Sequence, residues 1–149
     1  MAEPKRVLIL CTGNSCRSQM AEGWVNHDLA GNWIARSAGT QPASKVHPLA
    51  VAAMAEVGVD ISGGTPESVD PFVDAPWDLV VTVCDSAKET CPVFPGSVET
   101  LHISFPDPAE AVGSDAEVMA VFRAIRDDIR ERLVAELSRR TSGTTLKVG

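Results

Sequence analysis

The chain has 149 residues, a formal net charge of −7 and an isoelectric point near 4.9. Its length and its 44% content of hydrophobic residues fit a single globular domain with a buried core. Because an acidic surface repels polyanions, we exclude nucleic acid and anionic membranes as partners. The sequence has no apolar run long enough to span a membrane and no signal-peptide pattern at its start, so we expect a cytoplasmic protein.

In chain order, short apolar stretches alternate with segments of helical spacing. The sequence predicts a strand at 6–10, a helix at 17–30, a strand at 33–37, a helix at 47–57, a strand at 78–83, a weaker strand at 101–104 and a long amphipathic helix at 116–137. This alternation predicts an α/β fold in which helices flank both faces of a four-stranded parallel sheet. We expect a single domain over residues 1–140 and a flexible tail over 141–149.

Three chemically active residues follow the predicted strands. The first strand ends at Cys11, the third ends at Cys84, and the fourth leads into Asp107. In an open parallel sheet, ligands bind at the carboxyl ends of the strands. We therefore expect these three side chains to lie at one edge of the sheet.

The loop after the first strand has the form C-x5-R-S, with the residues Cys11, Thr12, Gly13, Asn14, Ser15, Cys16, Arg17 and Ser18. A loop of this length can turn its backbone N–H groups towards a tetrahedral anion, and the following helix adds its N-terminal dipole. Arg17 can bind two oxygens of such an anion with its planar guanidinium. Gly13 and Asn14 are residue types that tolerate left-handed backbone angles. The sequence therefore predicts an oxyanion-binding P-loop.

The same surroundings favour the thiolate form of Cys11. Convergent amides, a helix N-terminus and a nearby guanidinium all lower the pKa of a cysteine. Ser18 is placed to donate a hydrogen bond to the Cys11 sulfur. The alternative interpretation is a buried cysteine at a strand end beside a surface arginine, and the Gly-Asn pair between strand and helix argues against it.

These motifs resemble a known family. The segment CTGNSCRSQMAEGW is similar to the arsenate reductases built on the low-molecular-weight tyrosine phosphatase fold, as are SAGT, HPLAVAAM, VGVDIS, DLVVTVCDSA, the Cys91-Pro92 pair and FPDPA. The resemblance covers nearly the whole chain. It implies a four-stranded parallel sheet flanked by helices, in agreement with the pattern above.

Asp107 is the candidate general acid. It lies between Pro106 and Pro108, which restrict the direction of its carboxylate. An oxygen that leaves a tetrahedral oxyanion must be protonated, and a carboxylic acid can supply that proton. An ordinary aspartate in a turn is the alternative from the sequence alone. The resemblance favours the acid, because the acid of the family occupies a similar Asp-Pro pair.

Cys84 and Cys91 distinguish a reductase from a phosphatase, which needs one nucleophilic cysteine. The resemblance implies a relay in which Cys11 attacks arsenate, Cys84 attacks Cys11, and Cys91 then takes over the disulfide. We expect thioredoxin as the reductant, with glutaredoxin and glutathione or mycothiol as alternatives. Two other interpretations are inert buried cysteines and a zinc site that includes Cys16, although the spacing of Cys84 and Cys91 is wide for zinc. Cys16 itself is expected to pack in the loop or to form an off-pathway disulfide.

The resemblance also suggests a potassium site, since some family members bind the cation at positions that match Asn14, Glu22, Ser37, Thr65 and Glu67. Glu67 stands where the family has an aspartate, so the resemblance does not decide whether potassium binds. No tightly bound cofactor is expected.

Two rival functions remain from the sequence. A tyrosine phosphatase would use the same loop and acid, but this chain has Ala109 and Glu110 where those phosphatases place aromatic residues. A thiol-based redox sensor or metal-binding module would need the cysteines without Arg17 or Asp107. We expect the protein to be a monomer.

Overall fold

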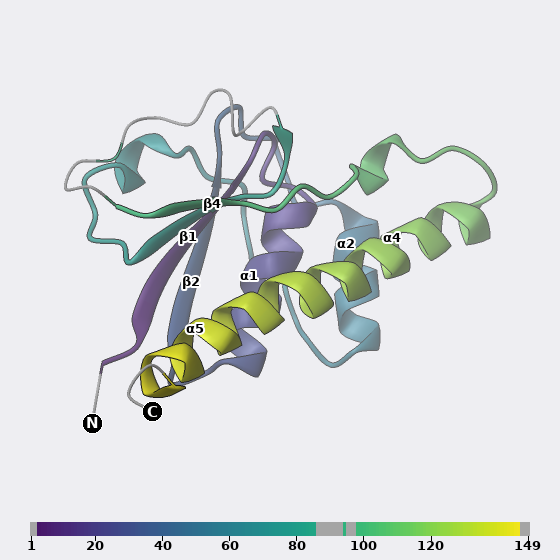
Figure 1. Cartoon of the computed structure of the whole chain (residues 1–149). Helices are drawn as coiled ribbons and strands as arrows, with labels where there is room; N and C mark the ends of the chain where they lie inside the picture. Colours follow the sequence, from purple (N-terminus) through teal and green to yellow (C-terminus); the bar gives the residue numbers. More distant parts are fainter. Residues whose placement is uncertain (1–2, 86–93, 95–97, 147–149) are drawn as a thin grey trace.

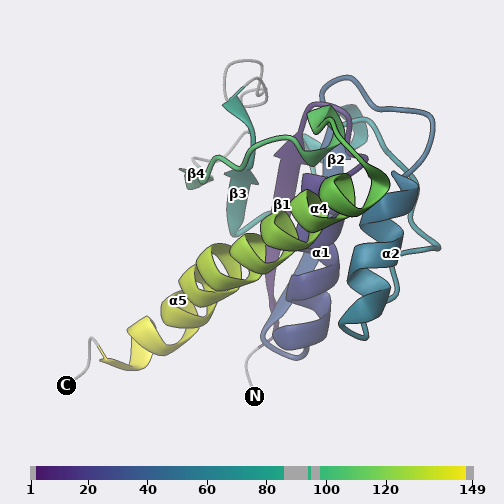
Figure 2. The ribbon, with the colours of Figure 1, turned by 90° about the vertical axis from the view of Figure 1, so that its right-hand side faces the viewer.

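A central parallel sheet of four strands organises the computed structural model, which describes residues 3–85, 94 and 98–146, with residues 141–146 described by their backbone only. Figure 1 shows the whole chain, and the strand order β2-β1-β3-β4 can be followed in Figure 2. The strands are β1 (Lys5–Cys11), β2 (Trp33–Gly39), β3 (Leu79–Thr82) and β4 (Thr100–His102). The predicted parallel sheet is confirmed, and only the ends of its strands differ from those expected.

The two central strands have few polar side chains because both of their faces are covered. Every residue of β3 is buried, and so are the last five residues of β1. Such continuous apolar runs are typical of parallel strands. The register pairs Cys11 with Gly39 of β2 and Leu10 with Thr82 of β3. The carboxyl ends of the central strands therefore meet at one edge of the sheet.

The α-helices of the described residues lie on one face of the sheet (Figure 2). Helix α1 (Arg17–Asp28) packs directly on β1 and β2, and helices α2 (Pro48–Glu56) and α4 (Asp115–Ile129) pack on α1 and on each other. Local signals fix their starts. Pro48 occupies the first turn of α2, and Ser114 and Glu117 form a capping box at α4.

The opposite face carries a shorter element than the sequence suggests. In the described part of the chain it is covered by the 3-10 helix η1 (Asp70–Phe72) and its flanking loop, and not by an α-helix. The guanidinium of Arg36, on β2, lies 5.0 Å from the centroid of the Phe72 ring. The guanidinium of Arg6, on β1, lies 5.2 Å from the Trp77 ring. Stacking on strand arginines thus attaches this loop to the sheet.

The predicted helix at 116–137 is a longer rod that contains a π-helical segment. Helix α4 continues through η3 (Arg130–Val134) into α5 (Ala135–Leu146), so the helix extends into the segment predicted as a tail. The buried residues Ile125, Ile129, Leu133 and Leu137 recur at intervals of four. A regular α-helical turn has about 3.6 residues, so side chains spaced by four gradually move around the helix. One wider π turn brings these side chains back to the face that packs on the core.

Among the described residues, none of the helices has the length and apolarity needed to cross a membrane.

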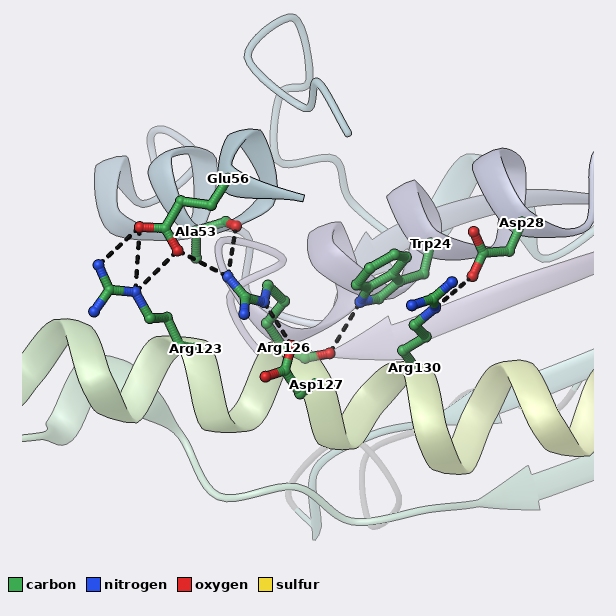
Figure 3. Close-up of polar contacts among 8 residues, drawn as sticks. All are labelled: Trp24, Asp28, Ala53, Glu56, Arg123, Arg126, Asp127 and Arg130. Carbon is green, nitrogen blue, oxygen red and sulfur yellow. Dashed lines mark hydrogen bonds and ion pairs between the residues drawn. The ribbon is translucent and has the colours of Figure 1, made fainter. Parts of the chain in front are cut away.

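A buried arginine of α4 attaches this helix to α1 and α2 (Figure 3). Arg126 donates through Nη1 to Ala53 O (3.0 Å) and to Glu56 Oε1 (2.9 Å). Its own carbonyl oxygen accepts a hydrogen bond of 2.9 Å from Trp24 Nε1 on α1. Arg123 makes a second ion pair with Glu56 at 2.8 Å. Glu56 therefore joins α2 to α4 through two arginines.

Acid is expected to weaken this junction. Arg123 and then Arg126 lower the pKa of Glu56 from 4.5 to about 2. A carboxyl group whose pKa is lower in the folded than in the unfolded protein stabilises the fold when it is ionised. For Glu56 this contribution is complete above pH 4.5 and is lost as the pH falls through about 2. Thermal denaturation at pH 7, 5 and 3 should show a smaller loss of stability at low pH in Glu56→Gln than in the wild type. Glu131→Gln, which removes an exposed carboxylate from the same rod, is the control and should retain the wild-type pH profile.

Candidate functional site

The loop between β1 and α1 is held by its outward-facing carbonyl groups. Three backbone N–H groups of a neighbouring segment donate to them: Gln41 to Thr12 O at 2.9 Å, Ala43 to Gly13 O at 2.8 Å, and His47 to Ser15 O at 2.9 Å. Because a trans peptide directs its C=O and N–H to opposite sides, the following amides of the loop face inwards. The loop thus presents N–H groups to its own centre, as an oxyanion site requires.

Asn14 and Gly39 allow this loop to form. Asn14 is the residue with left-handed backbone geometry, at φ 53°. Gly13 tolerates the same geometry but does not adopt it, since it is absent from the positive-φ residues and a Cβ there would make ordinary contacts. Gly39, at the end of β2, is needed for a different reason. A Cβ on Gly39 would lie 2.5 Å from Thr12 O, so a side chain would push the loop away from the strand.

The Cys11 sulfur lies at the centre of a polar network. Cys11 is buried, and its Sγ lies 3.0 Å from Ser18 Oγ and accepts a 3.3 Å hydrogen bond from the Asn14 backbone N–H. The Asn14 side-chain amide donates to Ser18 Oγ at 2.7 Å. Since that bond uses Ser18 as an acceptor, its hydroxyl hydrogen is available to the sulfur. Sγ thus has two hydrogen-bond donors beside it, the Asn14 N–H and the Ser18 hydroxyl.

Arg17 opens α1 and reaches across the mouth of the loop. Its Nη1 donates to Phe105 O at 3.0 Å, and its Nη2 lies 3.6 Å from Asp107 Oδ2. Its Nε is buried and has no hydrogen-bond partner among the described residues. A buried donor without a partner is costly, so this N–H indicates an acceptor that the protein itself does not supply. An oxyanion in the loop is such an acceptor.

Asp107 faces Arg17 from the loop after β4. Its Oδ1 accepts a 3.0 Å hydrogen bond from the Ala109 N–H and thereby caps the 3-10 helix η2 (Pro108–Glu110). Its side chain is 30% exposed. The carboxylate is thus held by a backbone amide on one side and remains accessible on the other, as a proton donor to a bound anion must be.

Cys84 lies next to the loop between β1 and α1. It is buried, and its Sγ lies 3.4 Å from Oγ1 of Thr12, the residue after Cys11. A pocket of about 430 Å³ opens here, and Thr12, Arg17, Cys84, Asp107 and Glu110 are among its lining residues. The structure therefore brings together the expected residues at the carboxyl edge of the sheet. Cys91 lies outside the described residues.

Cys16 is buried in the loop but unsuited to be a nucleophile. Burial raises the pKa of its thiol from 9.0 to about 11. The thiol therefore stays protonated at neutral pH, and its Sγ lies 3.7 Å from Ser15 Oγ. Among the described residues, no three His, Cys, Asp or Glu side chains are grouped as ligands for a metal ion.

The residues suggested for potassium lie in one region, although one side chain turns away. Ser37 donates a hydrogen bond to the Glu22 carboxylate, and burial raises the pKa of Glu22. The backbone N–H of Glu67 donates to Asn14 Oδ1 at 2.9 Å. The carboxylate of Glu67, however, forms an ion pair of 3.1 Å with Arg36.

The remaining oxygens already have protein donors. Gln19 Nε2 lies 3.2 Å from both Asn14 Oδ1 and Thr65 O, and donates to each. This amide stands between two of the oxygens that would coordinate a cation. With Glu67 directed towards Arg36, the five residues do not fit a complete cation cage. We therefore assign no step of the chemistry to potassium.

Potassium is accordingly expected to leave the protein unchanged. The unfolding midpoint and the rate of Cys11 alkylation should agree in KCl and in NaCl of equal concentration, because neither cation finds the required set of oxygens. Choline chloride at the same concentration controls for ionic strength. A rise in the midpoint with KCl alone would show that Glu67 or Gln19 rearranges to admit the ion.

His102 is a residue near the site that the sequence did not single out. Its Nδ1 lies 2.7 Å from Thr82 Oγ1, and its Nε2 lies 2.9 Å from Asp85 Oδ1, next to Cys84. The strand register places it opposite Thr82. The position of His102 at the end of the fourth strand could have singled it out in the sequence. Its contact with Asp85 could not be predicted, because it depends on the path of the chain after β3.

Comparison with known proteins agrees with this geometry. The family model described as low molecular weight phosphotyrosine protein phosphatase matches residues 6–142. The chain therefore belongs to the low molecular weight phosphotyrosine protein phosphatase family. The resemblance seen in its motifs is confirmed over most of its length.

Within this family, the chain is similar to arsenate reductases. It is 49% identical to the arsenate reductase of Halalkalibacterium halodurans, over 87% of this chain and 92% of the relative. It is 47% identical to the arsenate reductase of Bacillus subtilis, over 88% of this chain and 94% of the relative. A solved structure of an arsenate reductase in a phosphate-binding state matches with a TM-score of 0.72 and 34% identity, over 91% of this chain and 98% of that one.

Proposed function

We propose that this protein reduces arsenate to arsenite through a relay of three cysteines. The single observation that carries the proposal is the second buried sulfur at the oxyanion loop, since Cys84 lies 3.4 Å from Thr12 Oγ1 beside the nucleophile Cys11. A hydrolase needs no such thiol. The similarity to arsenate reductases over most of the chain supports the same reaction.

The first step is the attack of Cys11 on arsenic. Arsenate binds to the loop amides and to Arg17, whose buried Nε gains an acceptor. The Cys11 thiolate forms an As–S bond, and one As–O bond breaks. The departing hydroxyl takes a proton from Asp107 and leaves as water. The arsenic remains pentavalent and is attached to the enzyme.

The second step transfers the electrons. The Cys84 thiolate attacks the Cys11 sulfur, so that an S–S bond forms while the As–S bond breaks. The electron pair of the As–S bond stays on arsenic, which becomes trivalent and leaves as arsenite. Two thiols are oxidised to one disulfide, and this supplies the two electrons.

The third step restores Cys11. Cys91 attacks Cys84, and a Cys84–Cys91 disulfide replaces the Cys11–Cys84 disulfide while Cys11 leaves as a thiolate. A dithiol protein of the thioredoxin class then reduces Cys84–Cys91. We place the reaction in the cytoplasm, where such reductants maintain thiols, and we expect the enzyme to act as a monomer.

The phosphatase alternative is less well supported by the pocket. The oxyanion loop suits any tetrahedral anion, so slow hydrolysis of a small aryl phosphate is consistent with it. However, Glu110 and Asp85 line the pocket together with Asp107. These carboxylates oppose an anionic phosphopeptide, and Phe105, the aromatic residue among the lining residues, is buried at 1% exposure.

The test is a coupled assay with arsenate, thioredoxin, thioredoxin reductase and NADPH, in which arsenite is quantified. Wild-type protein should turn over many times, while Cys91→Ser should stop after about one turnover and accumulate a Cys11–Cys84 disulfide that peptide mass spectrometry detects. Absence of arsenite together with steady hydrolysis of an aryl phosphate would assign the protein to the phosphatases instead.

A further inference from the structure

Arg132 connects the C-terminal helical rod with the loop that carries Asp107. Its Nη1 donates to Ser104 O at 3.2 Å. Its guanidinium carbon lies 4.8 Å from the centroid of the Phe105 ring. Asp128, one turn earlier, lies 3.3 Å from the same Nη1 and directs the guanidinium. Arg132 thus contacts both the backbone and the side chain of this loop.

Phe105 links Arg132 to the oxyanion site. Its ring, its N–H and its carbonyl oxygen each contact a different neighbour. Its ring is buried, at 1% exposure. Its N–H donates to Val83 O at 3.1 Å, one residue before Cys84. Its carbonyl oxygen accepts the 3.0 Å hydrogen bond from Arg17 Nη1. A shift of Phe105 would therefore move an acceptor of Arg17 and the chain that leads to Asp107.

This geometry points to Arg132 as a positioning residue for the oxyanion site. By holding Phe105 and Ser104 in place, Arg132 fixes the direction of Arg17 and the location of Asp107 without touching the substrate. The inference rests on the proposed reductase function and extends it to a residue of the C-terminal rod. Small displacements of groups that orient a reacting anion have large effects on rate.

Arg132 and Arg130 reach different neighbours because they lie two residues apart on the rod. Residues at this spacing project from roughly opposite sides of a helix. Both arginines lie in η3, so each contacts a different part of the protein. Arg130 stacks on Trp24 of α1 at 4.7 Å and pairs with Asp28 at 2.8 Å.

Arg130 therefore provides a matched control. Both arginines stack on an aromatic ring, both pair with an aspartate, and their exposed fractions are similar, 57% for Arg130 and 47% for Arg132. Of the two, Arg132 contacts the loop that carries Asp107, and Arg130 contacts α1. Comparison of Arg132→Met with Arg130→Met separates positioning of the site from general support of the rod.

The experiment compares the wild type with Arg132→Met, Arg132→Lys and Arg130→Met. In the coupled arsenate assay, we expect kcat to fall about tenfold in Arg132→Met and to stay within about twofold in Arg130→Met. Arg132→Lys should recover to within about threefold of the wild type, because an ammonium can stack on Phe105 and donate to Ser104 O. Thermal denaturation monitors the stability of each variant.

A second measurement does not depend on reductase activity. Inorganic phosphate protects Cys11 from iodoacetamide when it fills the loop, and the concentration for half-protection should rise about threefold in Arg132→Met alone. Equal half-protection in both Met variants, or an equal fall in kcat, would overturn the positioning role. If wild-type protein produces no arsenite, the proposed function fails, while the phosphate comparison still decides whether Arg132 positions the site.

Discussion

Cys84→Ser should bind arsenate and release almost no arsenite. We expect the single-turnover rate of arsenite formation to fall by about a thousand-fold or more. A serine hydroxyl cannot form with the Cys11 sulfur the disulfide bond that the Cys84 sulfur forms. The measurement is a rapid-quench reaction of reduced protein with one equivalent of arsenate, without thioredoxin. Serine is close in size to cysteine, so the contact with Thr12 Oγ1 should survive.

The control for this variant is the state of Cys11 itself. The rate of iodoacetamide alkylation at Cys11, and its protection by phosphate, should match the wild type, since the loop amides and Ser18 are unchanged. Arsenite formation at the wild-type single-turnover rate would show that another group accepts the Cys11 sulfur. Cys16 is a poor substitute, because burial raises the pKa of its thiol to about 11.

The sequence was sufficient for the features that depend on local chemistry. The C-x5-R-S loop, the apolar central strands and the Asp-Pro pair are each encoded within a few neighbouring residues. Parallel strands direct their carboxyl ends to one edge, so the location of Cys84 at the same edge as the loop after Cys11 also followed from the sequence. The loop of the phosphatase-like fold is therefore predictable without coordinates.

Features set by contacts between distant elements were not predictable. Glu67 turns to Arg36 because β2 places that arginine beside it, and no spacing in the sequence indicates this ion pair. The interval of four between apolar residues in the last helix is visible in the sequence. The π-helical segment that accommodates this interval is seen only in the structure. The contact of Arg132 with Phe105 also depends on how the rod packs against the loop after β4. Such contacts arise from how elements pack, and many arrangements satisfy the same pattern.

Arg17→Lys should separate the charge of this residue from its shape. Lysine keeps the positive charge but loses the planar guanidinium. In Arg17 this group reaches Phe105 O and Asp107 while its buried Nε has no protein partner among the described residues. We expect kcat/KM for arsenate to fall by about a hundred-fold to a thousand-fold, as for the loss of one preorganised oxyanion donor. Half-protection of Cys11 by inorganic phosphate should require a correspondingly higher concentration.

Arg139→Lys is the control, since Arg139 is 66% exposed and pairs with Glu136 on the rod. Its kcat/KM should equal that of the wild type. If Arg17→Lys retained wild-type turnover, positive charge alone would be enough at this position. The buried Nε would then have no role in binding arsenate, and the loop amides would have to supply the specific recognition of the oxyanion. A loss confined to Arg17→Lys, with normal stability, means that the planar guanidinium is what the loop requires.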